Sequence, residues 1–106
     1  MTQDWAADVR KYVTNPDANA IIGIVRHCGI ALQKRDSSLV SFTDKEEVER
    51  VRTKFLKKKL GLTNPDTDLD KAIYAVSDKM KGDHTKNRVT VYYLLADYFG
   101  KLSALN

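Results

Sequence analysis

The sequence predicts an all-α fold, a single compact bundle of four or five helices with the C-terminal helix at its centre. Three observations predict it. Apolar side chains recur every three or four residues in five segments, which is the period of a helix face. Proline and glycine residues separate these segments. The last segment is apolar on nearly every side, as expected for a helix that its neighbours bury.

Length and composition indicate one helical domain over residues 1–106. A chain of 106 residues can form one hydrophobic core, and its 42% hydrophobic and 30% charged residues are close to those of an average soluble domain. No run rich in glycine, serine or proline forms a linker. A disordered or fibrous chain is therefore excluded.

The first expected helix covers about residues 3–14. Trp5, Val9 and Tyr12, followed by Val13, fall on one helix face. Pro16 ends the segment, because the residue before a proline disfavours helical backbone angles.

The second expected helix covers about residues 17–28. Asp17 can cap its amino end and Gly29 can follow its carboxyl end. Its apolar face contains Ile21, Ile24, Val25 and Cys28. Residues 30–42 have no clear period, and Asp36–Ser38 is typical of a turn.

The third expected helix covers about residues 44–60. Thr43 as the N-cap and Glu46 three residues later match a capping box. Val48, Val51 and Phe55 form its apolar face, and Gly61 follows its end.

The fourth expected helix covers about residues 68–81, between a capping Thr67 and a closing Gly82. Its apolar face contains Leu69, Ala72, Ile73, Val76 and Met80. This spacing is that of a helix packed on one side.

The fifth expected helix covers residues 86–99. The run 91–95 would also suit a strand, but no other segment offers a convincing partner strand. We therefore predict a central helix. Its tyrosines Tyr92, Tyr93 and Tyr98 are expected in the core with their hydroxyls reaching the surface, and the alternative is an aromatic patch that binds a partner.

Two motifs resemble a known family. They are Lys54-Phe55-Leu56-Lys57-Lys58-Lys59-Leu60-Gly61-Leu62 and Asn87-Arg88-Val89-Thr90-Val91-Tyr92-Tyr93-Leu94-Leu95, which continues to Phe99-Gly100-Lys101. The chain resembles a small bacterial family characterised only as a domain of unknown function. The resemblance is strongest over 43–101 and weakest over 1–14. It implies a short, all-helical, bacterial cytoplasmic protein, and it implies no catalytic residue, ligand or partner.

Few residues offer site chemistry. Cys28 is the only cysteine, so no internal disulfide can form, and its place on an apolar helix face indicates a buried thiol. The adjacent His27 points about 100° away from it on a helix, which disfavours a shared metal site. His84 is expected to be a solvated loop histidine. We therefore predict no metal site.

Alternating aspartates at 66, 68 and 70 raise the possibility of a calcium loop. That loop requires glycine at its sixth position and glutamate at its twelfth, and counting from Asp66 these positions hold Lys71 and Ser77. Acidic residues at a helix start instead stabilise the helix dipole. The sequence also contains no phosphate-binding glycine loop and no nucleophile motif, so we predict no cofactor and no catalytic residues.

The most distinctive charged feature is a basic ridge, which we define as Arg50, Lys54, Lys57 and Lys58. The first three are spaced to share one side of a helix and could contact phosphates. The simpler interpretation is that acidic residues occupy the start of this helix and lysines its end, as the helix dipole favours.

These observations favour a non-enzymatic domain that binds another protein, acts as an adaptor or associates with itself. The alternative is weak, sequence-independent binding of nucleic acid or another polyanion through the basic ridge. Net charge is only +4, from 18 basic and 14 acidic residues, which is modest for a nucleic-acid-binding protein. With no signal-peptide pattern and no apolar run long enough to span a membrane, the sequence predicts a cytoplasmic protein.

Overall fold

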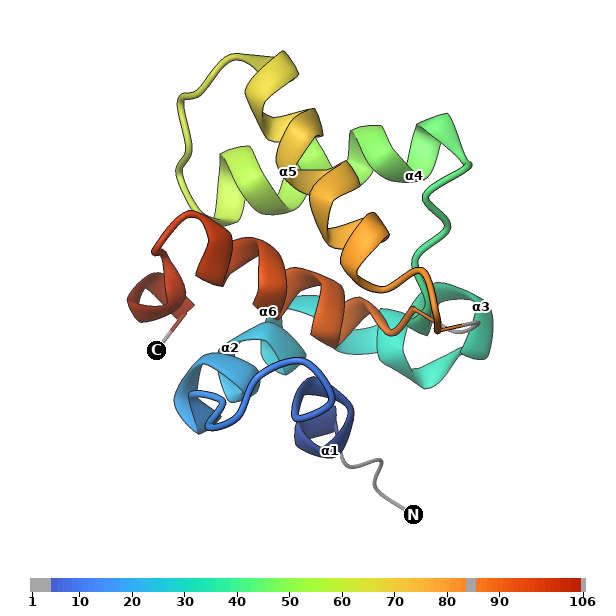
Figure 1. Ribbon diagram of the computed structural model, residues 1–106, viewed down its shortest axis with the longest axis vertical. Coiled ribbons are helices and arrows are strands. Elements are labelled where there is room, and N and C mark those ends of the chain that lie inside the picture. The colour runs from blue at the N-terminus through green and yellow to red at the C-terminus, as the bar shows by residue number, and fades with distance from the viewer. Residues whose placement is uncertain (1–4, 84–85, 106) are drawn as a thin grey trace.

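The computed structural model describes residues 5–83 and 86–105, and this part of the chain is all-α (Figure 1). Its only β-type contact is an isolated bridge between Leu39 and Asn87. The elements are α1 (Trp5–Val9), α2 (Ala18–Cys28), the 3₁₀-helix η1 (Gly29–Gln33), α3 (Arg35–Ser38), α4 (Lys45–Arg50), the π-helix η2 (Val51–Lys59), α5 (Asp66–Lys79), α6 (Arg88–Tyr98) and the 3₁₀-helix η3 (Leu102–Leu105).

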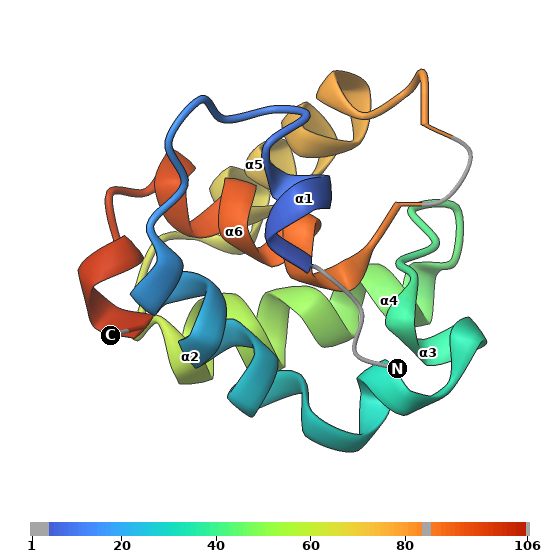
Figure 2. The same cartoon turned by 90° about the horizontal axis from the view of Figure 1, so that it is seen from below.

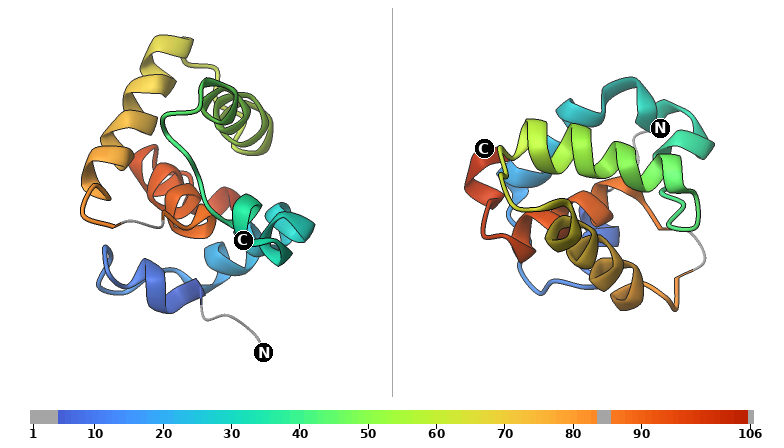
Figure 3. Two further views of the ribbon diagram at one scale, coloured as in Figure 1. Left: turned by 90° about the vertical axis from the view of Figure 1, so that its right-hand side faces the viewer. Right: turned by 90° about the horizontal axis from the view of Figure 1, so that it is seen from above.

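Helix α6 lies at the centre, as predicted. It runs between a layer formed by α1 and α2 and a second layer formed by α4, η2 and α5 (Figures 1 and 3). Every residue from 88 to 96 is buried. The helical interpretation of 91–95 is therefore confirmed, because burial on all sides explains a helix with no polar face.

The predicted ends of α2 are confirmed. The Asp17 carboxylate accepts hydrogen bonds from the backbone N–H groups of Asn19 and Ala20 at 3.0 and 3.2 Å. Gly29 adopts a φ of 53° and donates its N–H to the Val25 carbonyl, as a residue that ends a helix does.

The first helix is shorter than predicted. It ends at Val9 instead of continuing to residue 14, and the N–H groups of Lys11 and Tyr12 make shorter-range turn bonds to Asp8 and Val9. Contacts far along the chain explain this, because the Tyr12 hydroxyl donates to the Asp83 carboxylate at 3.0 Å. Val9 is fully buried, while Trp5 packs against the core only in part.

Residues 30–42 are more regular than predicted. They contain most of η1 and all of α3, and the expected turn at Asp36–Ser38 lies inside α3. The Ser37 hydroxyl joins the two elements by donating to the Ala31 carbonyl at 2.6 Å. This bond joins residues only six positions apart in the sequence and so favours compact helical turns. The spacing of apolar residues does not indicate such a bond.

The amino end of α4 differs from the prediction by one residue. Asp44, not Thr43, is the N-cap, and its carboxylate accepts from the Glu46 N–H at 3.0 Å. The Thr43 hydroxyl instead lies 3.3 Å from that of Ser41. The predicted capping box is therefore wrong, and Glu47, now the third helical residue, points toward the core.

The second half of the predicted 44–60 helix is a π-helix. Its hydrogen bonds span five residues, as from the Leu60 N–H to the Phe55 carbonyl at 2.9 Å. A π-helix has more residues per turn than an α-helix, so a smaller angle around the helix axis separates the side chains of neighbouring residues. This places Phe55 and Leu56, which are adjacent in sequence, both in the core.

Helix α5 begins earlier than predicted and ends earlier as well. It starts at Asp66 with Pro65 as the flanking residue, so Thr67 is inside the helix and is not its cap. It ends at Lys79, with Met80 as the C-cap in place of the expected Gly82. The N–H groups of Asp68 and Leu69 donate to the Pro65 carbonyl at 3.0 and 3.2 Å, which begins the helix at this earlier point.

The C-terminal 3₁₀-helix η3 was not predicted. It packs across α2, beside Gly23 (Figure 2). Leu105 is 3% exposed there, so η3 contributes to the core. Within residues 5–83 and 86–105, no helix has the length and apolar character needed to cross a membrane.

Candidate binding pocket

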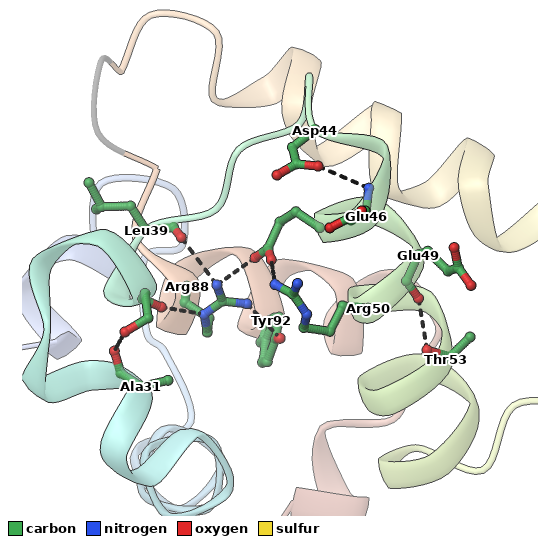
Figure 4. Close-up of polar contacts among 11 residues, drawn as sticks. Ala31, Leu39, Asp44, Glu46, Glu49, Arg50, Thr53, Arg88 and Tyr92 are labelled. Carbon is green, nitrogen blue, oxygen red and sulfur yellow. Dashed lines mark hydrogen bonds and ion pairs between the residues drawn. The ribbon is translucent and has the colours of Figure 1, made fainter.

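A buried ion pair between Arg88 and Glu47 organises one end of the molecule. The two residues are 6% and 5% exposed, and Arg88 Nη2 lies 2.5 Å from Glu47 Oε1. Arg88 also donates to the Ser37 and Leu39 carbonyls at 2.7 and 3.2 Å and to the Tyr92 hydroxyl at 3.0 Å (Figure 4). It therefore fixes α3 and α4 against the first turn of α6.

Arg50 binds the same carboxylate. Its Nη1 contacts Glu47 Oε2, while half of its side chain remains exposed (Figure 4). The single negative charge of Glu47 thus pairs with two guanidinium groups. The cluster retains an excess of positive charge, which is costly inside a protein unless another anion balances it.

A cavity of about 350 Å³ opens beside this cluster, and we name it the basic pocket. It is lined by His27, Cys28, Ala31, Ser37, Arg50, Lys54, Arg88 and Tyr92. None of these residues carries a carboxylate. A second cavity, of about 270 Å³, lies on the other side of Arg50 and Arg88 and contains the carboxylates of Asp36, Asp44 and Glu47 in its lining. The two arginines therefore separate a basic cavity from an acidic one.

Aromatic rings form part of the wall of the basic pocket. Phe55 and Tyr92 stack with their ring centroids 4.0 Å apart, and the His27 ring lies 5.7 and 6.2 Å from them. Burial, and then the charge of Lys59, lower the pKa of His27. We therefore expect a neutral imidazole at pH 7.

The Cys28 thiol and the Tyr92 hydroxyl, which also line the pocket, are protonated at neutral pH. Burial raises the pKa of the Cys28 thiol to about 11, although the charge of Arg88 opposes this. Burial also raises the pKa of Tyr92. Cys28 packs against the core but is only partly buried, so the predicted buried thiol is confirmed in part. It also faces the pocket, which the sequence did not indicate. A thiol with this pKa is a poor nucleophile at neutral pH.

The structure divides the basic ridge. Arg50 and Lys54 line the basic pocket, whereas Lys57 Nζ pairs with Asp66 Oδ1 at 2.5 Å and Lys58 is exposed. Among residues 5–83 and 86–105, no ion pair is formed by Lys54 or Lys58. Two residues of the basic ridge, Arg50 and Lys54, therefore line a cavity. Lys57 joins η2 to α5, and Lys58 is exposed to solvent.

The aspartates predicted to lie at a helix start do so. Asp66 and Asp68 are in the first turn of α5, and Asp70 forms an ion pair with Arg52 at 2.8 Å. In the described part of the chain, no cluster of three histidine, cysteine or carboxylate side chains is arranged to hold a metal ion. His84 lies outside the described residues.

A second surface feature is a groove between α5 and α6, which we name the tyrosine groove. It is a hollow of about 200 Å³ lined by Ala75, Val76, Lys79, Leu94, Asp97 and Tyr98. Tyr92 and Tyr93 are buried as predicted, and the Tyr93 hydroxyl accepts from the Asp17 N–H at 2.7 Å. Tyr98 is 58% exposed, so its predicted place in the core is wrong. It lies in the last turn of α6, beyond the buried run of that helix.

Sequence reasoning missed His27 and Arg88 as pocket residues. Arg88 stands at the start of a strongly apolar helix, and a charge in such a position needs a buried partner. That signal indicates a pair but does not identify Glu47, which is 41 residues away.

Comparison with known proteins agrees with the sequence resemblance. No curated protein matches the chain. The family model described as "Protein of unknown function (DUF2853)" matches residues 4–103, which is nearly the whole chain. The chain therefore belongs to the DUF2853 family of proteins of unknown function.

Proposed function

We propose that this chain is a bacterial cytoplasmic protein-binding domain without enzymatic activity, which acts as an adaptor or associates with itself through the tyrosine groove. The observation that carries the proposal is the exposure of Tyr98 beside a hollow between two helices. Tyrosine is enriched in protein interfaces and among the residues that contribute most of their binding energy.

The lining of the groove is suited to a partner surface. Val76 and Leu94 are only 4% exposed at its base, while Lys79 and Asp97 supply opposite charges at its edge. An apolar base with a polar edge is the usual anatomy of a protein interface. A partner side chain in the hollow would cover the ring of Tyr98.

The chemistry of the buried polar groups supports a role in binding rather than catalysis. The carboxylate of Glu47 holds Arg88 and Arg50, and that of Asp8 accepts a hydrogen bond from Thr90. These groups stabilise the fold. The thiol of Cys28, whose pKa is raised to about 11 by burial, is protonated at neutral pH.

The test compares Tyr98→Ala with Tyr74→Ala. Tyr74 is a matched control, because it is also an exposed tyrosine, at 52%, but does not line the groove. Sedimentation equilibrium measures self-association, and crosslinking in native cells followed by mass spectrometry identifies partners. We expect Tyr98→Ala to lose the association and Tyr74→Ala to keep it. Equal behaviour of wild type and Tyr98→Ala in both measurements would contradict the proposal.

A second candidate function is binding of nucleic acid or another polyanion through the basic ridge. It is favoured by the absence of ion pairs at Lys54 and Lys58 within the described chain. Replacing all four ridge residues by glutamine, which keeps helix propensity, should then weaken DNA or RNA binding at low salt and flatten its salt dependence. If wild type shows no binding at low salt, this candidate is wrong.

A further inference from the structure

We propose that the basic pocket binds a small phosphate monoester, whose phosphoryl group lies between Arg50, Lys54 and Arg88 and whose body lies against His27 and Tyr92. This inference goes beyond the proposed protein-binding function, because it concerns a different face of the molecule. It rests on the charge, the donors and the size of the cavity.

Charge is the first argument. Arg50, Lys54 and Arg88 bring three positive charges to the pocket, and within the described chain Glu47 is the carboxylate that forms ion pairs with the two arginines and compensates one of these charges. The remaining two charges match a phosphate monoester, which carries roughly −1.5 to −2 at pH 7. A carboxylate or a sulfate ester, with one negative charge, would leave part of this positive charge uncompensated.

Hydrogen-bond donors are the second argument. Arg88 is held by Ser37, Leu39 and Glu47, so its guanidinium is already oriented before any ligand arrives (Figure 4). Those three contacts and the bond to Tyr92 use four of its five N–H groups and leave one at Nη1. Tyr92 accepts that bond, so its own O–H proton remains to donate.

The flexible donors stand at the exposed side of the pocket. Arg50 is 49% exposed and uses Nη1 for Glu47, which leaves N–H groups of its guanidinium for a ligand. Lys54 is exposed and forms no ion pair with any described residue. A preoriented buried arginine with mobile cations in front of it can close around a phosphoryl group.

Size and shape select a small molecule. A cavity of about 350 Å³ is at the small end of the range for ligand pockets, roughly 300–1,000 Å³. The rings of His27 and Tyr92 add a partly apolar wall for a planar body. The site therefore differs from the basic ridge, which would follow a nucleic-acid backbone along the outside of η2 and would use Lys58.

The test is a titration of the isotope-labelled full chain, followed by the amide resonances in NMR spectra. The probe is phenyl phosphate, compared with inorganic phosphate and with phenyl sulfate, which has the same shape and one negative charge. We expect phenyl phosphate to shift the resonances of His27, Ser37 and Arg88 in a saturable way. Inorganic phosphate should act on the same residues more weakly, and phenyl sulfate should bind at least about tenfold more weakly than phenyl phosphate, because it offers the same oxygens but carries only one negative charge.

Two single variants locate the binding. Lys54→Gln removes an exposed pocket cation and should weaken phenyl phosphate about tenfold, the effect of one lost charge-assisted hydrogen bond. Lys58→Gln is the matched control from the same helix and should leave the affinity unchanged, because Lys58 does not line the pocket. The proposal is overturned if no saturable shift occurs at the pocket, if phenyl sulfate binds equally well, or if both variants weaken binding equally.

Discussion

Glu47 is the residue on which the buried charges depend. It is 5% exposed and is the carboxylate partner of both Arg88 and Arg50. Removing one member of a buried ion pair leaves the other charge without compensation. Glu47→Gln keeps the size of the side chain but removes its charge, and we expect it to lower the free energy of unfolding by about 3 kcal/mol.

Denaturant unfolding of this variant checks the prediction, and Glu46→Gln is the matched control. Glu46 is the adjacent residue of α4 and is exposed, so its change should stay within about 0.5 kcal/mol of wild type. Equal stability of the two variants would show that the Arg88 cluster does not depend on the charge of Glu47.

Asp8 makes the stability depend on pH. Burial raises its pKa, but hydrogen bonds from Thr90, Lys11 and Asn87 together outweigh burial, so the net pKa lies below the ordinary value. A carboxylate with a lowered pKa in the folded state stabilises the fold above its unfolded pKa, and this stabilisation is lost as the pH falls through the folded pKa. The stability difference between wild type and Asp8→Asn should therefore be largest at neutral pH and should shrink below about pH 4.

Thermal unfolding of both proteins over a series of pH values measures this difference. The matched control is Asp78→Asn, since Asp78 lies on the exposed side of α5. Because this side chain is exposed, its replacement should change the stability at neutral pH less than Asp8→Asn does. A difference for Asp8→Asn that stays constant from neutral to acid pH would contradict the assignment.

At the scale of elements, apolar spacing predicted every long helix, while the hydrogen bonds at the helix ends determined where the helices begin and end. Asp17 was correctly predicted as a cap because it stands alone before an apolar segment. Thr43 and Asp44 are adjacent and can both cap a helix, so the sequence alone favoured the wrong one. The choice of Asp44 makes Glu47 face Arg88, a contact over 41 residues that local patterns do not contain.

The candidate pocket was predictable only in part, for a similar reason. Arg50 and Lys54 were identified as possible anion ligands from their spacing on one helix. His27 and Arg88 reach the same cavity from α2 and α6, and only the packing of those helices brings them together. The π-helix also changes which lysines face the cavity, and an α-helical wheel cannot show that.

Gly23 shows a constraint between elements that can be tested. A Cβ atom at this position would lie 1.8 Å from the backbone carbonyl oxygen of Leu105, so η3 could not keep its place against α2. Alanine in a helix interior is otherwise favoured over glycine by about 1 kcal/mol. We expect Gly23→Ala to lower the melting temperature despite that gain, because the buried Leu105 must move.

Gly82→Ala is the matched control for this change. Nothing lies within 4 Å of a Cβ atom at Gly82, and its φ is not positive. Alanine there should leave the stability equal or raise it by roughly 0.4–1 kcal/mol, because it restricts the unfolded chain. A Gly23→Ala protein as stable as the Gly82→Ala protein would show that η3 does not need this close approach.

At the scale of the whole molecule, α6 connects both layers of the fold. This helix lies between the layer of α1 and α2 and the layer of α4, η2 and α5 (Figure 3). Leu95, in α6, is fully buried. Leu95→Ala should lower the free energy of unfolding by about 2–5 kcal/mol, through lost burial and the cavity that remains. Ile22→Ala, at a position that is 50% exposed, is the matched control and should change it by about 0.5 kcal/mol or less.

The same variant tests whether the chain unfolds as one domain. Trp5 is the only tryptophan and packs against the core from α1, so its fluorescence reports on one layer, while circular dichroism reports on all helices. Because both layers pack on α6, we expect the two signals to change at the same denaturant concentration in wild type and in Leu95→Ala. Separate transitions would mean that α1 and α2 unfold independently of α4, η2 and α5. In that case α6 would not couple the layers, and the burial of its residues 88–96 would have to be explained by packing within one layer alone.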